Sequence, residues 1–383
     1  MVRLVRLGKS MHSVADKLKV GSSTVWRWAH RTDGQRLDRA DFATRKPGRA
    51  WNRTDAELEQ RIVELRHSLA ATALGNNGAR AIHNALRAQA SPIPTSVATI
   101  NRVLSRRGLQ DGVGRIRRPA PPKGWYLPQV MAGRVELDSF DFIEELKIAD
   151  GPLVNVLTAK SLHGSLTDAW VLERLSTTAS MPLLLGRWQR DGLPGYAQFD
   201  NDMVFQGAHR FSDTVGRISR LCLALGVIPV FAPPAEHGMQ NSIESFNALW
   251  QTKVWQRYRF SSIAELQARS AAYIAAHRTS TANIAAAAPP RRPLPAHVEL
   301  DLGAPLSGQM IFIRRTDDTG RVHLLGQHFA LSTDWPNRLV RCEVDFDHRC
   351  IRGYALRRRI PTEQPLLTTL EYHRPYKRFR GEL

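Results

Sequence analysis

The order of apolar patterns between residues 131 and 285 constrains the fold more than any other feature of the chain. Three strand-like runs come first: MAGRVELDSFDF (131–142), PLVNVLTAKSL (152–162) and SLTDAWVLE (165–173). Helix-like and strand-like patterns then alternate up to a long helix that starts near Asn241. Strands joined by short turns pair antiparallel, whereas strands joined through helices pair parallel. The sequence therefore predicts a mixed α/β sheet.

Three acidic residues occupy positions that such a sheet brings together. Asp138 lies within the first strand, Asp200 at the carboxyl end of the fourth, and Glu244 on the helix after the fifth. Asp141 is an alternative to Asp138, three residues along and hence on the opposite face of the strand. Asp202, past the strand end, is an alternative to Asp200. We favour Asp138, Asp200 and Glu244 as the catalytic residues.

A group of three carboxylates implies a metal. Such a group is mutually repulsive unless a cation lies among its members. Hard divalent cations such as Mg²⁺ or Mn²⁺ take oxygen ligands, and two ions about 4 Å apart activate one oxygen and stabilise the leaving one in phosphoryl transfer. We therefore expect Asp138, Asp200 and Glu244 to be the ligands of two metal ions.

The formal net charge of +19 is concentrated at the two ends of the chain. Residues 1–130 hold 24 Lys and Arg against 9 Asp and Glu, residues 131–306 hold 16 against 17, and residues 307–383 hold 14 against 9. Basic ends around a nearly neutral centre are typical of a protein whose ends grip a polyanion. The charge pattern therefore indicates a polyanionic partner.

The composition excludes several classes of protein. With 43% hydrophobic residues, the 383-residue chain can bury cores, which excludes global disorder. No apolar run approaches the ~20 residues that span a bilayer, and the first ten residues lack the apolar run of a signal peptide. Cys222, Cys342 and Cys350 show no paired spacing, which fits a reducing compartment. We expect a cytoplasmic protein that makes no membrane contact.

Residues 11–31 predict two short helices joined by a tight turn. Apolar residues recur at helical spacing on both sides of Gly21, and Lys19 occupies a turn position where Gly is usual. This is the pattern of a helix-turn-helix, whose second helix offers side chains to phosphates and base edges. The alternative is a plain helical hairpin on a core. The candidate DNA-binding residues of this module are Ser22, Ser23, Thr24, Arg27 and Arg31.

A second module of the same kind follows at residues 54–110. Thr54 and the acidic residues after it predict a helix start, and Ser96 predicts the cap of a last helix in which Ile100, Val103 and Leu104 face inward. Two modules in tandem favour DNA binding over a purely structural role. The candidate DNA-binding residues here are Asn101, Arg102, Arg106 and Arg107.

The long helix after the fifth strand continues into a stretch in which aromatic and basic residues alternate. Interleaved groups of this kind contact nucleic acid by stacking and by charge. We expect Lys253, Arg257 and Arg259 to contact DNA, and Trp250 and Trp255 to be buried.

The spacing of the three acids resembles the DDE triad of retroviral-integrase-type transposases. Asp138 and Asp200 are separated by 61 residues, and Asp200 and Glu244 by 43. The closest local matches are GYAQFDNDMVF (195–205) and APPAEHGMQNSIESFNALW (232–250), and the chain is similar to the bacterial insertion-sequence group that includes the IS481 and IS3 families. The second interval is longer than is typical of the group, which implies an insertion near residues 207–220.

The resemblance implies a multidomain α+β chain with an N-terminal tandem helix-turn-helix, an RNase H-like mixed α/β catalytic core and a C-terminal small SH3-like β-barrel. Four strand-like runs after the Pro-rich stretch at 289–295 fit such a barrel, with Arg314 and Arg315 as candidate DNA contacts. The expected divisions are a helix-turn-helix at 1–33, a basic linker at 34–53, a second helix-turn-helix at 54–110, a basic linker at 111–130, the catalytic core at 131–285, a Pro-rich linker at 286–306, the barrel at 307–360 and a basic tail at 361–383.

The resemblance also implies a function. A transposase of this group binds the terminal inverted repeats of its element and the target DNA, both double-stranded, and catalyses metal-dependent 3′-end cleavage and strand transfer. It would act as a homo-oligomer, at least a dimer on DNA, in the bacterial cytoplasm at the nucleoid. Two alternatives stay open: a catalytically inactive or domesticated DNA-binding regulator, and an RNase H-fold nuclease without strand transfer.

Overall fold

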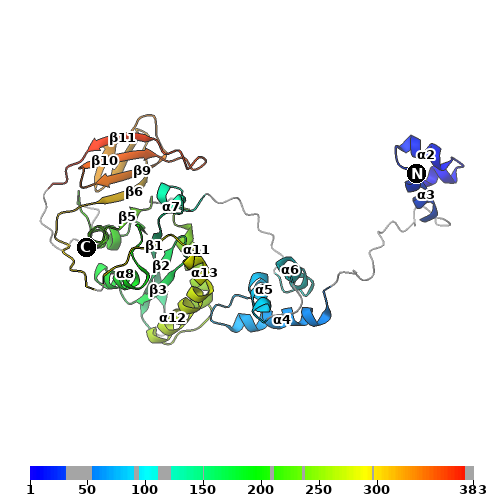
Figure 1. The fold of residues 1–383 in the computed structure, drawn as a ribbon, viewed down its shortest axis with the longest axis horizontal. Helices are drawn as coiled ribbons and strands as arrows, with labels where there is room; N and C mark the ends of the chain where they lie inside the picture. The colour runs from blue at the N-terminus through cyan, green and yellow to red at the C-terminus, as the bar shows by residue number, and fades with distance from the viewer. Residues whose placement is uncertain are drawn as a thin grey trace. The chain divides into compact units, whose positions relative to one another are not determined.

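The computed structural model describes residues 1–31, 54–89, 95–110, 122–149, 151–207, 211–234, 238–295 and 297–375. The chain divides into two compact units, residues 1–60 and 61–383 (Figure 1). The predicted basic linker at 34–53, residues 111–121 of the second linker and residues 376–383 of the basic tail lie outside the described residues. So do residues 208–210 of the predicted insertion.

The two helices predicted for residues 11–31 are present in the first unit. A short α1 (Val2–Arg6) precedes α2 (Met11–Leu18) and α3 (Ser22–Arg31), and Val14, Ala15 and Val25 form their buried core. The Ser10 hydroxyl caps α2 by accepting a hydrogen bond from the Ser13 amide at 3.2 Å. Lys19 ends α2 in the left-handed conformation, with φ of 50°, which makes the turn that a glycine usually makes.

Three further helices follow: α4 (Ala56–Ala71), α5 (Ala79–Ala88) and α6 (Val97–Arg106). The predicted cap of α6 is confirmed, because the Ser96 hydroxyl accepts a hydrogen bond from the Thr99 amide at 3.1 Å. Ile100, Val103 and Leu104 are buried, as their spacing predicts. The outer face of α6 is therefore polar and basic.

The central sheet has the predicted mixed order. Strands β1 (Leu137–Lys147), β2 (Leu153–Ser161) and β3 (Thr167–Leu172) form the antiparallel meander. Strand β4 (Tyr196–Phe199) pairs parallel with β1, and β5 (Ile228–Phe231) pairs parallel with β4. This part of the sheet therefore has the order β3-β2-β1-β4-β5.

Helices cover both faces of this sheet (Figure 1). On one face, α8 (Thr177–Asp191) and α10 (Arg217–Ala224) pack over Phe140 of β1; the short α9 (Met203–Gln206) follows β4. On the other face, α11 (Asn241–Trp250) and α12 (Ile263–Ser280) pack over Ile143. A π-helical turn, η1 (Gln251–Trp255), extends α11, while α7 (Pro128–Met131) precedes β1 and α13 (Ala282–Ala286) follows α12. Alternate residues of β1 thus belong to two separate cores.

The C-terminal strands predicted after the Pro-rich segment are present, and they extend the central sheet. Strand β6 (Gln309–Arg315) pairs parallel with β5, and β9 (Leu339–Asp345), β10 (Cys350–Ala355) and β11 (Leu366–Glu371) continue antiparallel from it. The result is a nine-stranded sheet of order β11-β10-β9-β6-β5-β4-β1-β2-β3. Strands β7 (Arg321–Leu324) and β8 (Gln327–Ala330) form a two-stranded hairpin beside it.

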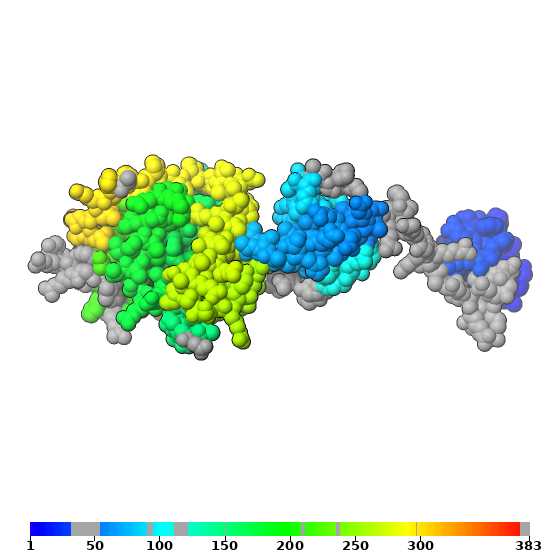
Figure 2. Space-filling view, turned by 90° about the horizontal axis from the view of Figure 1, so that it is seen from below, coloured from blue at the N-terminus to red at the C-terminus, as the bar shows by residue number. Residues whose placement is uncertain are grey.

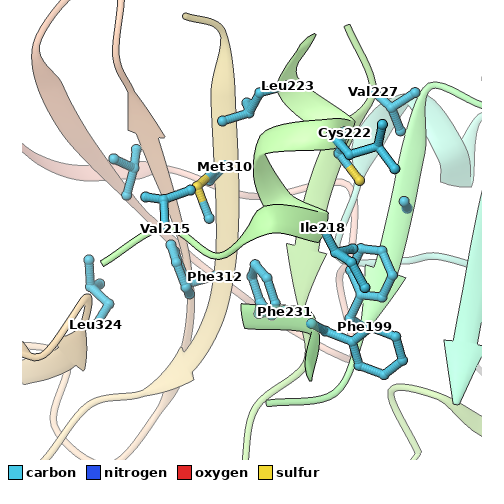
Figure 3. Packing of buried hydrophobic residues seen from close by; sticks show 14 of the residues in the cluster. Phe199, Val215, Ile218, Cys222, Leu223, Val227, Phe231, Met310, Phe312 and Leu324 are labelled. Atoms are coloured by element: carbon cyan, nitrogen blue, oxygen red, sulfur yellow. The ribbon is translucent and has the colours of Figure 1, made fainter. Parts of the chain in front are cut away.

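A continuous apolar core explains why β6 joins the sheet. Met310, Ile311, Phe312 and Ile313 are all buried, so β6 is covered on both faces, as expected of an interior strand next to a parallel neighbour. The Phe312 ring stacks on Phe231 of β5 with centroids 5.2 Å apart, and Figure 3 shows both rings among side chains of α10 and β4. The core of the mixed sheet therefore continues into the C-terminal strands without a boundary.

The Pro-rich stretch at 289–295 is docked on the core. Arg292 and Leu193 exchange two backbone hydrogen bonds, of 2.7 and 3.0 Å. The Arg292 guanidinium also donates to the carbonyl oxygens of Leu225 and Gly226. This segment is fastened to the core at several points and does not act as a loose linker.

Candidate active site

Asp141 lies on the face of β1 that is covered by α11. Its Oδ1 accepts a hydrogen bond from the Phe142 amide at 2.9 Å, and its Oδ2 accepts one from Asn247 Nδ2 at 2.7 Å. The neighbouring residue on β2 is Thr158, whose hydroxyl lies 3.0 Å from the Asp141 carbonyl oxygen and 2.7 Å from Asn247 Oδ1. Two buried polar side chains therefore hold the Asp141 carboxylate in one orientation.

The register of the parallel strands places Asp200 beside Asp141. Asp138 pairs with Ala197 and Ser139 with Gln198, so the same register two residues further puts Asp141 level with Asp200, just past the end of β4. The stacked rings of the intervening Phe140 and Phe199, with centroids 5.3 Å apart, agree with this register. Residues paired across a sheet project to the same face.

Asp202, the alternative to Asp200, has a structural task. Its carboxylate accepts a hydrogen bond from the Val204 amide at 2.7 Å and so caps α9. Its own amide donates to Asp200 Oδ1 at 3.0 Å. The structure thus separates the cap, Asp202, from the acid that shares a face with Asp141.

Glu244 lies on the helix that covers the same face of the sheet as Asp141. It lies in the first turn of α11, which packs against β1 and β2, and its side chain is exposed. Burial and the negative charges of Asp200 and Glu244 raise the pKa of Asp141 to about 7. This raised pKa indicates that the three carboxylates share one electrostatic environment.

Asp138, predicted to be catalytic, belongs to the opposite face of β1. Arg291 binds it through two hydrogen bonds of 2.9 and 2.6 Å, Arg187 donates to both of its oxygens at 3.0 and 3.2 Å, and the Trp188 indole donates at 3.2 Å. Its side chain is completely buried. Asp138 therefore lies on the face of β1 opposite to Asp200, and its catalytic role stays a prediction; Asp141, the alternative three residues along, lies on the face that Asp200 shares.

The ion pairs of Asp138 are part of a larger buried network. Arg187 also pairs with Asp168, and Arg278 of α12 joins Asp168 to Asp191 with contacts of 2.8 Å. Burial alone would raise the pKa of Asp138, but the charges of Arg187 and Arg291 hold it well below its usual range. This network fastens α8, α12 and the docked Pro-rich segment to the sheet.

Two of the predicted DNA contacts next to α11 are engaged within the chain. Lys253 Nζ donates to the Gly75 carbonyl oxygen at 2.8 Å, and the Arg257 guanidinium donates to the carbonyl oxygens of Thr72 and Ala70. Both cations lie at the C-terminal end of α4, where positive charge is stabilising. In Figure 2 the blue surface of α4 meets the yellow-green surface of the core. Arg259 is exposed.

Of the two tryptophans predicted to be buried, one is fully buried and the other is half-buried. Trp250 is completely buried and donates to the Ser270 hydroxyl, whereas Trp255 is half-buried. Of the two arginines predicted on the barrel edge, Arg314 is buried in the sheet and is not a surface contact. Arg315 is exposed and donates to the Asn337 carbonyl oxygen at 2.6 Å.

Most of the candidate DNA-binding residues in the helical modules lie on accessible faces. Ser22, Ser23 and Arg27 are exposed, and Thr24 and Arg31 are half-buried. Trp26 was not predicted: it is 54% exposed on the same helix, and its ring lies 4.2 Å from that of His30. The four candidates of the second module, which are Asn101, Arg102 and Arg106 on α6 and its C-cap Arg107, are all exposed.

A basic and aromatic surface at the end of the C-terminal strands was also missed. The Trp335 ring has the Arg338 guanidinium 4.6 Å and the Arg357 guanidinium 5.7 Å from its centroid. We call Trp335, Arg338, Arg357 and the adjacent Arg315 the Trp335 cluster. Two loops and the last residue of β6 supply it, so no local sequence pattern indicates it.

Asp141, Asp200 and Glu244 fit a divalent metal in charge and in donor type. Carboxylate oxygens are the ligands of hard cations, and a cation would offset the repulsion that raises the pKa of Asp141. Among the described residues, however, no group of three or more His, Cys, Asp or Glu side chains is arranged so that it could hold a metal ion. Among the helices of the same ranges, none is long and apolar enough to cross a membrane.

Comparison with known proteins gives similarity to integrases. No family model matches the chain, and no curated protein matches it. A solved intasome of simian T-cell lymphotropic virus, in complex with the PP2A regulatory subunit B56 gamma, is similar over 57% of this chain and 73% of its own, with 12% identity and a TM-score of 0.33. The catalytic core domain of BIV integrase is similar over 37% of this chain and 81% of its own, with 18% identity and a TM-score of 0.27. At these scores the functional argument rests on the strand order and the acidic group.

Proposed function

We propose that this chain is a DNA transposase of an insertion sequence, which cleaves the 3′ ends of its element and joins them to target DNA. The observation that supports the proposal is that Asp141 and Asp200 lie level at adjacent parallel strands, on the face of the β3-β2-β1-β4-β5 sheet that is covered by α11, the helix that carries Glu244. Acids on two adjacent parallel strands and on a covering helix form the kind of site that phosphoryl transfer requires.

The chemistry consists of two in-line displacements at phosphorus. Water attacks the phosphodiester at the element end and loses a proton to solvent, and the 3′-oxygen leaves and takes up a proton from solvent to become a free hydroxyl. That hydroxyl then attacks a target phosphodiester and displaces the target's own 3′-oxygen, with no covalent enzyme intermediate. Divalent cations held by Asp141, Asp200 and Glu244 would supply charge neutralisation and activation of the attacking oxygen.

The protein's own residues have two tasks in this scheme. Asn247 and Thr158 fix the orientation of Asp141, and the cap formed by Asp202 fixes the turn after Asp200. The exposed faces of α3 and α6 would bind the terminal inverted repeats, and the Trp335 cluster supplies further cations for a phosphate backbone. Because two element ends must be joined, we expect at least a dimer on DNA.

The test is an end-joining assay. The full chain is incubated with duplexes that carry the DNA flanking its reading frame, with Mg²⁺ or Mn²⁺ and a supercoiled target. We expect cleaved 3′ ends and joined products. Cleavage without joining would instead identify a nuclease of this fold, and metal-independent binding without cleavage would identify a DNA-binding regulator.

If α3 binds DNA, each arginine that contacts a phosphate should contribute to the salt dependence of the affinity. Replacing Arg27 by Ala should lower the slope of log K against log salt concentration by about 1, because one phosphate contact is lost. The measurement is fluorescence anisotropy of a labelled flanking duplex across a salt series. Lys17→Ala is the matched control, since it removes the same charge from α2; an equal change of slope in both variants would contradict a specific contact by Arg27.

A further inference from the structure

Arg314, at the end of β6, is a buried cation whose contacts converge on the turn after Asp200. Its side chain is only 7% exposed. Its guanidinium donates to Asn201 Oδ1 at 2.8 Å and to the Ala232 carbonyl oxygen at 3.2 Å, and it also contacts the carbonyl oxygens of Ile313 and His323. Asn201 immediately follows Asp200, and Ala232 immediately follows β5. One side chain therefore ties together the ends of three strands.

The direction of the strands explains why these ends meet. Strand β4 is parallel to β1, β5 is parallel to β4, and β6 is parallel to β5. The carboxyl ends of these four strands therefore lie side by side at one end of the sheet. In sheets of this kind, ligands bind outside the carboxyl ends of the strands. Asp200 and Arg314 both lie at the carboxyl ends of these strands, although more than a hundred residues separate them along the chain.

Asn201 is held from both sides of its amide. Its Nδ2 donates to the Ala232 carbonyl oxygen at 2.6 Å, while its Oδ1 accepts from Arg314. The Ala232 amide in turn donates to the Phe199 carbonyl oxygen at 3.0 Å. The backbone on either side of Asp200 is thus fixed by a closed set of hydrogen bonds, and Arg314 is the member that comes from the C-terminal strands.

A buried guanidinium is costly unless its donors are satisfied. The partners of Arg314 described above are neutral oxygens, whereas the equally buried Arg187 and Arg341 have carboxylate partners. A methionine or leucine would fill the same space without this desolvation cost. The specific contacts of Arg314 with the Asp200 turn give an arginine at this position a physical reason.

We propose that Arg314 is a positioning residue for the proposed active site: through Asn201 it fixes the direction of the Asp200 carboxylate. The inference rests on the function proposed above, but it makes a separate statement about metal binding. The C-terminal strands then contribute to the chemistry through the sheet itself, in addition to any contact with DNA.

The test compares Arg314→Met, Arg314→Lys and Asn201→Ala in the full chain. Partners that orient metal ligands typically change metal affinity by about 10- to 100-fold. We expect Arg314→Met and Asn201→Ala to raise the Mn²⁺ concentration at half-saturation by about that factor, measured from the EPR signal of free Mn²⁺ without DNA. The metal midpoint of end cleavage should shift equally, Arg314→Lys should recover part of the affinity, and the double variant should be no weaker than either single one.

Arg341→Met is the matched control. Arg341 lies on the adjacent β9 and is 5% exposed, but its contacts include Glu343, Gln364 and the Tyr126 carbonyl oxygen, and none of them is with the Asp200 turn. The Arg341→Met substitution should reduce stability without changing the Mn²⁺ concentration at half-saturation. Unchanged Mn²⁺ binding in Arg314→Met or Asn201→Ala, or an equal shift in Arg341→Met, would overturn the inference. If wild-type protein binds Mn²⁺ but cleaves no DNA, the proposed function fails while the role of Arg314 in metal binding is still measured.

Discussion

Asp141→Asn should abolish end cleavage and leave the protein folded. Asparagine keeps the size of the side chain and one oxygen acceptor, but it removes the charge that a divalent cation requires. Metal ligation supplies several kcal/mol of transition-state stabilisation, and each 1.36 kcal/mol is tenfold in rate, so we expect a loss on the order of 10³-fold or more. The measurement is the single-turnover rate of 3′-end cleavage, with Asp200→Asn and Glu244→Gln expected to behave alike.

The stability of this variant provides a second readout. Asp141 is partly buried beside two other negative charges, which raise its pKa, so removing its charge relieves repulsion. Urea denaturation of Asp141→Asn should therefore show a midpoint equal to or above that of wild type. Asp202→Asn is the matched control, because asparagine caps a helix as well as aspartate and should keep the cleavage rate near the wild-type value. An active Asp141→Asn protein would remove the acid from the proposed site.

Asp138→Asn should have the opposite profile, with a large loss of stability. Breaking a buried ion pair by removing one partner typically costs about 3–5 kcal/mol, since the remaining charge stays buried and uncompensated. Here the Arg291 guanidinium would lose its carboxylate partner on β1, and Arg187 would keep only its pair with Asp168. We expect a lower urea midpoint, and cleavage by the folded fraction that persists at low temperature.

The effect should also depend on pH. The pKa of Asp138 lies below its ordinary value of 3.8, so its contribution to stability is complete above that pH and is lost as pH falls toward the lower folded value. The difference in stability between wild type and Asp138→Asn should therefore shrink in acid. A stable but inactive Asp138→Asn protein would return Asp138 to the catalytic role that its position along the chain first indicated.

The order of strands and helices in residues 131–285 was predictable because each element carries its own periodicity. Short apolar runs bounded by turns predicted the meander, and the sequence GYAQFDND placed an acid at the end of the fourth strand. These are local patterns, and the structure confirms them at β1 to β5. Capping by Ser96 was predictable for the same reason.

The choice between Asp138 and Asp141 was not local. Strand alternation separates the two residues, but it does not say which face carries the site. The partners that occupy Asp138 come from 49 and 153 residues further along the chain, so no nearby pattern reveals them. A register argument would have helped: an acid level with Asp200 across a parallel pair must lie near the middle of β1, where Asp141 is.

One strand explains why the C-terminal strands continue the central sheet. A small barrel has one solvated face, so its strands should alternate between apolar and polar residues. MIFI in β6 is apolar at four consecutive positions, which is typical of a strand covered on both sides. That pattern indicates the interior of a larger sheet, although it does not identify β5 as the neighbour.

The parallel pairing of β5 with β6 has a consequence for how such a protein can change over time. A C-terminal part joined only by a tether could be exchanged between relatives as an independent cassette. Here an exchange would have to preserve the seam formed by Phe231 and Phe312 and the reach of Arg314 to Asn201. Chains truncated before residue 309 would expose that seam to water and should precipitate, so the two halves of the sheet are expected to be inherited together.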